Sequence, residues 1–133
     1  MAISAEDRIA INDLIALHGH LMDAGELDRL DELFSPEVVY DLGDFGLGPL
    51  QGIEAIRDAA IALGDRNPVG HHVTNVILTE MDEHAVQVRS KGIGIQADGS
   101  SGSVVYDDIV QRGPGGWRIA YRKVTARRTP LTA

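Results

Sequence analysis

GSVVYDDIVQRGPGGWRIAYRKVTARR, residues 102–128, decides the fold class of this chain. Valine, isoleucine and aromatic residues recur in two segments, 102–112 and 116–128, which the short link GPGG joins. β-branched and aromatic residues favour strands, and so short a link joins strands that run antiparallel. The stretch therefore predicts a β-hairpin near the end of the chain.

The same strand-like composition extends back to residue 70. HHVTNVILTE (71–80) and HAVQVRSKGIGIQA (84–97) predict two further strands, followed by the turn-like links MDE and DGSSG. Gly92 and Gly94 interrupt the second of these segments, so we expect a sharp bend or a bulge there. Four long strands in succession predict an antiparallel sheet.

Before residue 70 the apolar residues follow a helical period. A first helix is predicted to begin at Ser4 and to end near Gly25, because a hydroxyl caps a helix start and glycine favours its end. A second, short helix follows over 25–34, and a third spans 52–64. Between them, 37–52 predicts a strand, a turn and a short strand. Helices first and strands afterwards indicate an α+β domain, with three helices packed on one face of a curved antiparallel sheet.

The composition narrows the possible functions. The 133 residues suit one domain, 1–133, and the net charge of -8 would repel nucleic acid and anionic membranes. No cysteine is present, which excludes disulfides and thiolate chemistry. The N-terminus has no secretory signal, so we expect a cytoplasmic protein. The arginines near the end of the chain could make a local anion-attracting patch, but we expect them to form the solvated edge of the last strand: Arg118, Arg122, Arg127 and Arg128.

Two adjacent histidines, His71 and His72, open the strand predicted at 71–80. Neighbouring strand residues point to opposite faces of a sheet, so at most one of the two looks inward. Both faces carry polar and apolar residues, and alternation does not choose between them. Neither this pair nor His18 and His20 on the first helix can chelate one metal, so no metal site is expected.

Two polar residues on the first helix have alternative interpretations. His18 lies on the apolar stripe, as a core histidine or as a polar group in the wall of a cavity. Asp23 lies at the C-terminal end, where the helix dipole disfavours a carboxylate. It is either exposed or directed inward to orient a histidine. The chain has no nucleotide-binding glycine motif and no nucleophile elbow, so no cofactor is expected and acid–base chemistry remains.

Three stretches resemble the SnoaL-like branch of the nuclear transport factor 2-like superfamily: HGHLMDAGELDRLDELFSPEVVYD (18–41), GHHVTNVIL (70–78) and YDDIVQRGPGGWRIAYRKV (106–124). The resemblance implies a cone-shaped α+β barrel of three helices on a strongly bent sheet, and a homodimer. The superfamily includes dehydratases, a dehydrochlorinase, a steroid isomerase, polyketide cyclases and domains with no known catalysis. The fold therefore does not choose the function.

The resemblance also implies site residues. Lyases of the dehydratase and dehydrochlorinase type use a His–Asp dyad, whose Asp ends the first helix and whose His opens an H-x-x-x-N segment. Here that segment begins at His71, which selects it over His72 and pairs it with Asp23. Residues at positions that bind substrate or line the pocket are Tyr40, Asn75, Tyr106 and Asp108.

Position 18 departs from the family pattern. Many members carry Tyr there and the dehydrochlorinase carries Lys, whereas this chain has His18. A histidine could polarise a carbonyl or protonate a leaving hydroxyl, and it could equally mark lost activity. The expected function is a lyase or isomerase that acts on a small hydrophobic cyclic substrate through His71, Asp23 and His18. The alternatives are a non-catalytic small-molecule-binding or polyketide-cyclase-like domain, and a dimerisation module with a vestigial pocket.

Overall fold

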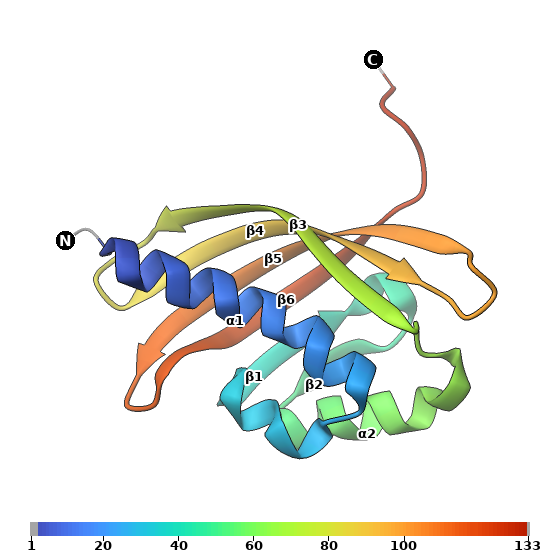
Figure 1. Ribbon diagram of the computed structural model, residues 1–133, viewed down its shortest axis with the longest axis horizontal. Helices are drawn as coiled ribbons and strands as arrows, with labels where there is room; N and C mark the ends of the chain where they lie inside the picture. The colour runs from blue at the N-terminus through green and yellow to red at the C-terminus, as the bar shows by residue number, and fades with distance from the viewer. Residues whose placement is uncertain (1–2, 133) are drawn as a thin grey trace.

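The computed structural model describes residues 3–132, in which helices cover one face of a curved sheet (Figure 1). The chain forms, in order, α1 (Ala5–Ala24), η1 (Leu27–Glu32), β1 (Phe34–Leu42), η2 (Gly43–Phe45), β2 (Gly48–Gln51), α2 (Ile53–Leu63), η3 (Gly64–Arg66), β3 (Gly70–Glu80), β4 (Ala85–Ile95), β5 (Ser101–Gly113) and β6 (Gly116–Arg127). The second predicted helix, 25–34, is a single 3-10 segment, η1. It ends earlier than predicted because β1 already begins at Phe34.

The sheet has six strands in the order β2-β1-β6-β5-β4-β3. All neighbouring pairs are antiparallel except β1 and β6, which are parallel. The predicted α+β fold, with three helices on a curved and mostly antiparallel sheet, is confirmed. Within residues 3–132, no helix combines the length and apolar character needed to cross a membrane. The homodimer and the cytoplasmic location stay predictions.

A capping box begins α1 at the predicted residue. The Ser4 hydroxyl accepts from the backbone N–H of Asp7 at 3.0 Å, and the Asp7 carboxylate accepts from the backbone N–H of Ser4 at 3.1 Å. The same carboxylate accepts bonds from the Arg112 guanidinium, at 3.1 and 3.2 Å, and from the indole N–H of Trp117 at 3.2 Å. These bonds hold the pKa of Asp7 well below its usual range, and the bond from Arg112 has the largest effect. The start of α1 is thereby fixed to the β5–β6 hairpin.

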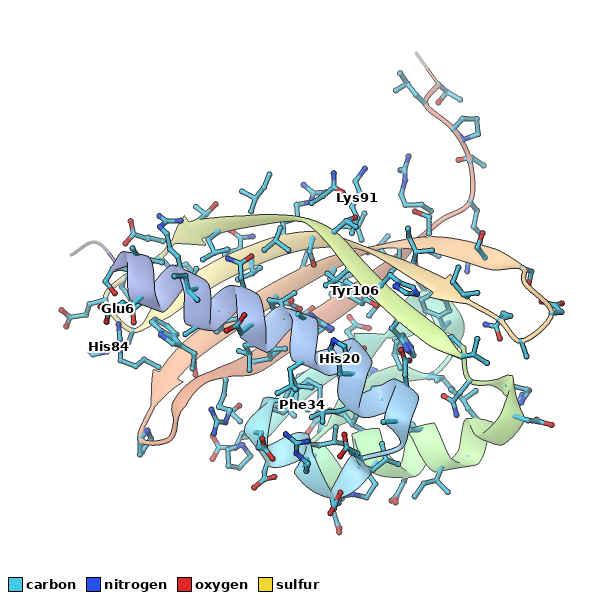
Figure 2. The ribbon with its side chains drawn as sticks, viewed as in Figure 1. Glu6, His20, Phe34, His84, Lys91 and Tyr106 are labelled. Atoms are coloured by element: carbon cyan, nitrogen blue, oxygen red, sulfur yellow. The ribbon has the colours of Figure 1, made fainter. Side chains whose placement is uncertain are left out.

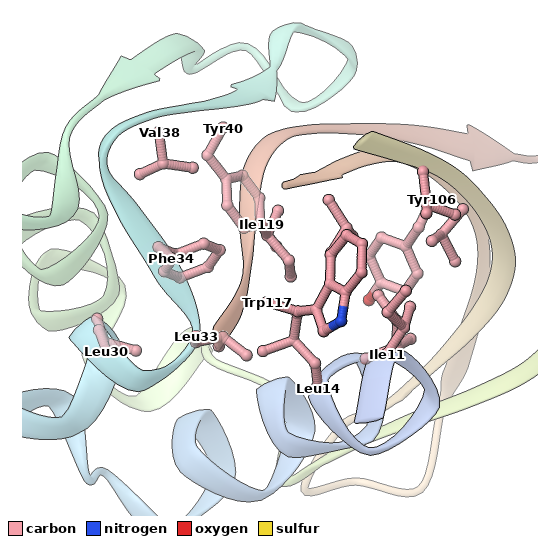
Figure 3. Packing of buried hydrophobic residues seen from close by; sticks show 14 of the residues in the cluster. Ile11, Leu14, Leu30, Leu33, Phe34, Val38, Tyr40, Tyr106, Trp117 and Ile119 are labelled. Carbon is pink, nitrogen blue, oxygen red and sulfur yellow. The ribbon is translucent and has the colours of Figure 1, made fainter. Parts of the chain in front are cut away.

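The hydrophobic core lies between α1, η1 and the concave face of the sheet (Figure 3). Ile11 and Leu14 of α1 face Trp117 and Ile119 of β6, and Phe34 closes the side formed by β1. All five side chains are at least nine-tenths buried. α1 thus packs its apolar stripe onto the inner strands of the sheet, as the helical spacing predicts.

Strand β3 carries a bulge that the sequence did not indicate. Its register with β4 shifts between Thr74 and Ile77, and Asn75 has a φ of 56°. Asparagine adopts this left-handed conformation more readily than most residues. One extra residue reverses the alternation, so the face that carries Val73 continues through Val76 rather than Asn75.

Of the sharp bend or bulge predicted at Gly92 and Gly94, the bulge is wrong. Both residues pair in unbroken register, Gly92 with Val73 and Val104 on the flanking strands. A different physical need explains Gly92, because a Cβ there would lie 2.4 Å from the Tyr106 ring. The glycine makes room for an aromatic side chain rather than for an extra residue.

Arg122 also contradicts a prediction, since it lies in the interior and not at a solvated edge. Its side chain is 1% exposed, because β6 is an inner strand flanked by β1 and β5. It donates from Nε and Nη2 to the two carboxylate oxygens of Asp108, at 2.7 and 2.8 Å. Its guanidinium carbon lies 4.2 Å from the centre of the Tyr106 ring. Asp108 is therefore committed to an internal ion pair.

This pair predicts a large difference between two neighbouring carboxylates. Asp108→Ala leaves the Arg122 charge buried without a partner, and we expect the free energy of unfolding to fall by about 3–5 kcal/mol. Asp107→Ala breaks only a solvent-exposed pair with Arg89 and is expected to cost less than about 1 kcal/mol. Urea unfolding followed by circular dichroism measures both. Equal losses in the two variants would contradict the structural role given to the buried pair.

Candidate functional site

A cavity of about 440 Å³ opens beside the C-terminal end of α1. α1, β1 and α2 supply most of its wall, and the start of β3 completes it. The wall is mainly apolar, with His18, Asp23 and His71 as polar members near one another. Its apolar side chains include Met22, Leu27, Leu42, Leu50, Ile56 and Leu63. A concave apolar site with a few converging polar groups is typical of small-molecule binding.

Asp23 and His71 form a dyad in this wall. The imidazole Nδ1 of His71 lies 2.6 Å from one carboxylate oxygen of Asp23, and the backbone N–H of His71 donates to the other at 2.9 Å. About a quarter of each side chain is exposed. Because a carboxylate only accepts hydrogen bonds, Nδ1 carries the proton, so whenever the ring is neutral its free lone pair lies on Nε2. The arrangement orients His71 to accept a proton.

Gly19 brings the two halves of the dyad together. A Cβ at this position of α1 would lie 2.5 Å from the backbone oxygen of His71. Only glycine lets the helix backbone approach β3 so closely, and Asp23, one turn later, then reaches the start of the strand. Sequence reasoning missed Gly19, and the one available signal was a glycine inside an otherwise regular helix.

His18 lies behind the dyad and is 3% exposed. Its Nε2 is hydrogen-bonded to the Tyr40 hydroxyl at 3.1 Å, and its ring meets that of His71 edge-on, with centroids 5.7 Å apart. Burial, and then the charges of Arg122 and His71, lower the pKa of His18 well below its ordinary value. The residue is therefore a neutral histidine that is both buried and part of the cavity wall, which unites the two interpretations that the sequence left open.

A second cavity of about 260 Å³ adjoins the first. The two share part of their wall, including Tyr40 and His71, so the dyad histidine faces both. Tyr106 and Gln96 are further polar members of the second cavity. No lysine or arginine is among the described residues that line either cavity, and Asp23, the one carboxylate there, is paired. The combined space thus suits an uncharged ligand.

The structure brings together five of the seven site residues that the resemblance implied. His18, Asp23, Tyr40 and His71 line the first cavity, and Tyr106 lines the second together with Tyr40 and His71. His72 lies on the opposite, exposed face of β3, as the selection of His71 requires. Among the described residues, no three metal-ligating side chains of His, Cys, Asp or Glu cluster closely enough to hold a metal ion.

Two of the implied residues lie outside both cavities. Asn75 is exposed because the bulge turns it away from the face that carries His71. Asp108 is sealed in its ion pair with Arg122 and is 1% exposed. We therefore correct the expectation that these two residues contact a substrate. A local backbone conformation turns Asn75 outward, and an internal ion pair holds Asp108 in the interior.

The state of His18 predicts a pH-dependent stability. Its pKa is lowered on folding, so below about pH 6.5 the unfolded chain binds a proton that the folded protein does not. The free energy of unfolding should then fall toward acid by up to about 1.4 kcal/mol per pH unit, and His18→Gln should remove this part of the slope. Urea unfolding at about pH 7.5, 6.5 and 5.5 measures it. The control is His72→Gln, a change at an exposed histidine, which should retain the wild-type slope. An unchanged slope in His18→Gln would contradict the lowered pKa assigned to His18.

Comparison with known proteins agrees with this fold. Residues 4–123 match the family model of the SnoaL-like domain, whereas no curated protein sequence matches the chain significantly. Three similar solved structures come from Novosphingobium aromaticivorans. One is provisionally assigned as an aromatic ring hydroxylase (26% identity, 96% of this chain and 94% of that chain covered, TM-score 0.81). Another is a nuclear transport factor 2-like protein with a cystatin-like fold (26% identity, 91% of this chain and 82% of that chain covered, TM-score 0.75). The third is provisionally assigned as a scytalone dehydratase (18% identity, 98% of this chain and 93% of that chain covered, TM-score 0.75). At 18% identity the likeness concerns the fold alone. The family model covers nearly the whole chain, and the protein belongs to the SnoaL-like domain family of the nuclear transport factor 2-like superfamily.

Proposed function

We propose that this protein is a small-molecule lyase or isomerase of the dehydratase type, with His71 as its general base. The observation that carries the proposal is the double contact of Asp23 with His71, through ring and backbone, at the wall shared by two apolar cavities. Membership in the SnoaL-like family supports it.

The reaction begins with removal of a proton from carbon. Nε2 of His71 takes the proton, and the electron pair of the broken C–H bond moves toward an adjacent carbonyl or expels a leaving group on the next carbon. The imidazolium that forms donates Nδ1–H to Asp23, whose negative charge stabilises it. General-base help of this kind is worth about 10²–10⁴ in rate. In this scheme His18 is a neutral polar group of the wall and not a charged acid.

The cavity walls restrict the substrate. Both cavities are lined mostly by apolar side chains, with no lysine or arginine to attract a carboxylate or phosphate among the lining residues described. Desolvating an ionic group there without a partner would be costly. We therefore propose an uncharged hydrophobic ring compound as the substrate, and the proposal requires no cofactor.

Exchange of carbon-bound protons tests the chemistry with a simple ketone in place of the natural substrate. The probe is 2-tetralone, an uncharged bicyclic ketone, whose exchange with D₂O is followed by proton NMR. We expect the wild-type protein to accelerate exchange, and His71→Gln and Asp23→Asn to lose about 10²–10⁴ of that acceleration. His72→Gln, a change at the adjacent histidine on the exposed face, should keep the wild-type rate.

The same variants separate catalysis from simple binding. Wild-type exchange equal to that of His71→Gln would contradict the proposed base. If 2-tetralone also raised the unfolding temperature of both proteins equally, the result would favour the alternative of a non-catalytic binding or cyclase-like domain. Circular dichroism of each variant, compared with wild type, establishes that any lost exchange is not due to unfolding.

A further inference from the structure

We propose that the hydroxyl of Tyr106 donates the hydrogen bond that stabilises the negative charge on a substrate carbonyl oxygen when His71 removes the adjacent proton. We further propose that Gly92 is the positioning residue that lets the Tyr106 ring reach this place. Both roles rest on the proposed function. They add a second catalytic group to the reaction in which His71 is the base, and they require that the substrate carry a carbonyl group.

The Tyr106 hydroxyl is free to serve a ligand. The side chain is 7% exposed and lines the second cavity, whose wall also includes His71. No hydrogen bond joins this hydroxyl to any other residue within 3–132, whereas the hydroxyl of Tyr40, the other tyrosine in the cavity walls, is bonded to His18. The hydroxyl therefore faces the cavity with its donor uncommitted, and a ligand oxygen can accept from it.

The sheet register directs Tyr106 toward the dyad. Its backbone pairs with Ser90 on β4, but its ring lies over Gly92, two residues further along that strand. Gly92 in turn pairs with Val73 on β3, and the next inward position of β3 in that direction is His71. The ring therefore leans diagonally across β4 toward the end of the sheet where the dyad lies. Figure 2 shows Tyr106 on the helix-covered side of the sheet.

Two contacts hold the ring in that direction. The guanidinium of Arg122, fixed by Asp108, lies 4.2 Å from the ring centre. In addition, a Cβ at position 92 would lie 2.4 Å from Cε2 and 2.8 Å from Cζ, the carbon that bears the hydroxyl. Even a methyl group there would displace the phenol end, and so Gly92 positions the donor.

The protonation state suits a donor. Burial raises the pKa of Tyr106, and the negative charges of Asp108 and Asp23 raise it further against the opposing charge of Arg122. The hydroxyl thus keeps its proton throughout the neutral range.

The proposed step conserves atoms and charge. The C–H bond next to the carbonyl breaks, the proton moves to Nε2 of His71, and the electron pair forms the C=C bond of an enolate. The carbonyl oxygen takes up the negative charge, and the Tyr106 O–H donates to it without giving up its proton. A later return of the proton, or loss of a leaving group on the next carbon, completes isomerisation or elimination. The substrate class is therefore an uncharged ring ketone with an acidic neighbouring C–H.

Three tyrosine and glycine variants test the proposal with 2-tetralone exchange. Tyr106→Phe removes only the donor and is expected to lower kcat about 10²–10³-fold with little change in KM. Tyr121→Phe, the same change at the tyrosine outside both cavities, should keep wild-type kcat and KM. Gly92→Ala should also lower kcat, but it should add little when combined with Tyr106→Phe, because both act through one hydroxyl.

A binding measurement supplies a readout independent of turnover. The probe is 4-nitrophenol, whose yellow phenolate form mimics the enolate oxygen and is followed by absorbance. We expect Tyr106→Phe and Gly92→Ala each to weaken phenolate binding at least about tenfold, as loss of one charge-assisted hydrogen bond requires. Tyr121→Phe should bind as the wild type does.

The outcomes separate this proposal from the function on which it rests. If His71→Gln loses exchange while Tyr106→Phe retains wild-type kcat and phenolate affinity, the general base stands and the role of Tyr106 is overturned. If His71→Gln retains exchange, the proposed function itself fails. Additive losses of kcat in the Gly92→Ala, Tyr106→Phe double variant would show that Gly92 acts on folding rather than on Tyr106.

Discussion

The close approach of α1 to β3 is the constraint on which the candidate site depends. Gly19 removes the side chain that would collide with the backbone oxygen of His71, and the helix and strand meet there. Asp23 then accepts from both the backbone and the ring of His71. These two bonds offset the cost of a carboxylate at the negative end of a helix dipole, a cost that would otherwise make Asp23 a poor choice. One contact thus serves both packing and chemistry.

A second constraint comes from the ion pair beneath the cavities. Arg122 and Asp108 place opposite charges in the interior, each almost fully buried. The positive charge helps to keep His18 neutral and lies against the ring of Tyr106. The residues that line the cavities therefore stay uncharged apart from the dyad, while a charged pair behind them fixes the direction of an aromatic side chain. Replacing the pair would disturb the wall as well as the core.

The sequence predicted the elements well because helical and strand periods are local properties. The resemblance chose His71 and Asp23, a pairing that periodicity alone left open. Prediction failed where the cause leaves no trace in the periodicity of the sequence. Asn75 turns outward because one left-handed residue reverses the alternation of β3, and Arg122 is buried because β1 pairs beside β6. The close contact between Gly92 and Tyr106 joins two strands, and its one sign in the sequence, a glycine inside a strand, does not say what the glycine makes room for.

Position 18 shows how a family site can change residue without gaining charge. A histidine there would be cationic in water for part of the physiological pH range, yet burial and Arg122 hold it neutral and Tyr40 satisfies its Nε2. A cation next to His71 would disfavour the imidazolium that proton abstraction creates. A neutral His18 avoids that conflict, so the substitution is compatible with a working base. The polarity of the position is kept, and Asp23 orients a different histidine, the proposed base His71.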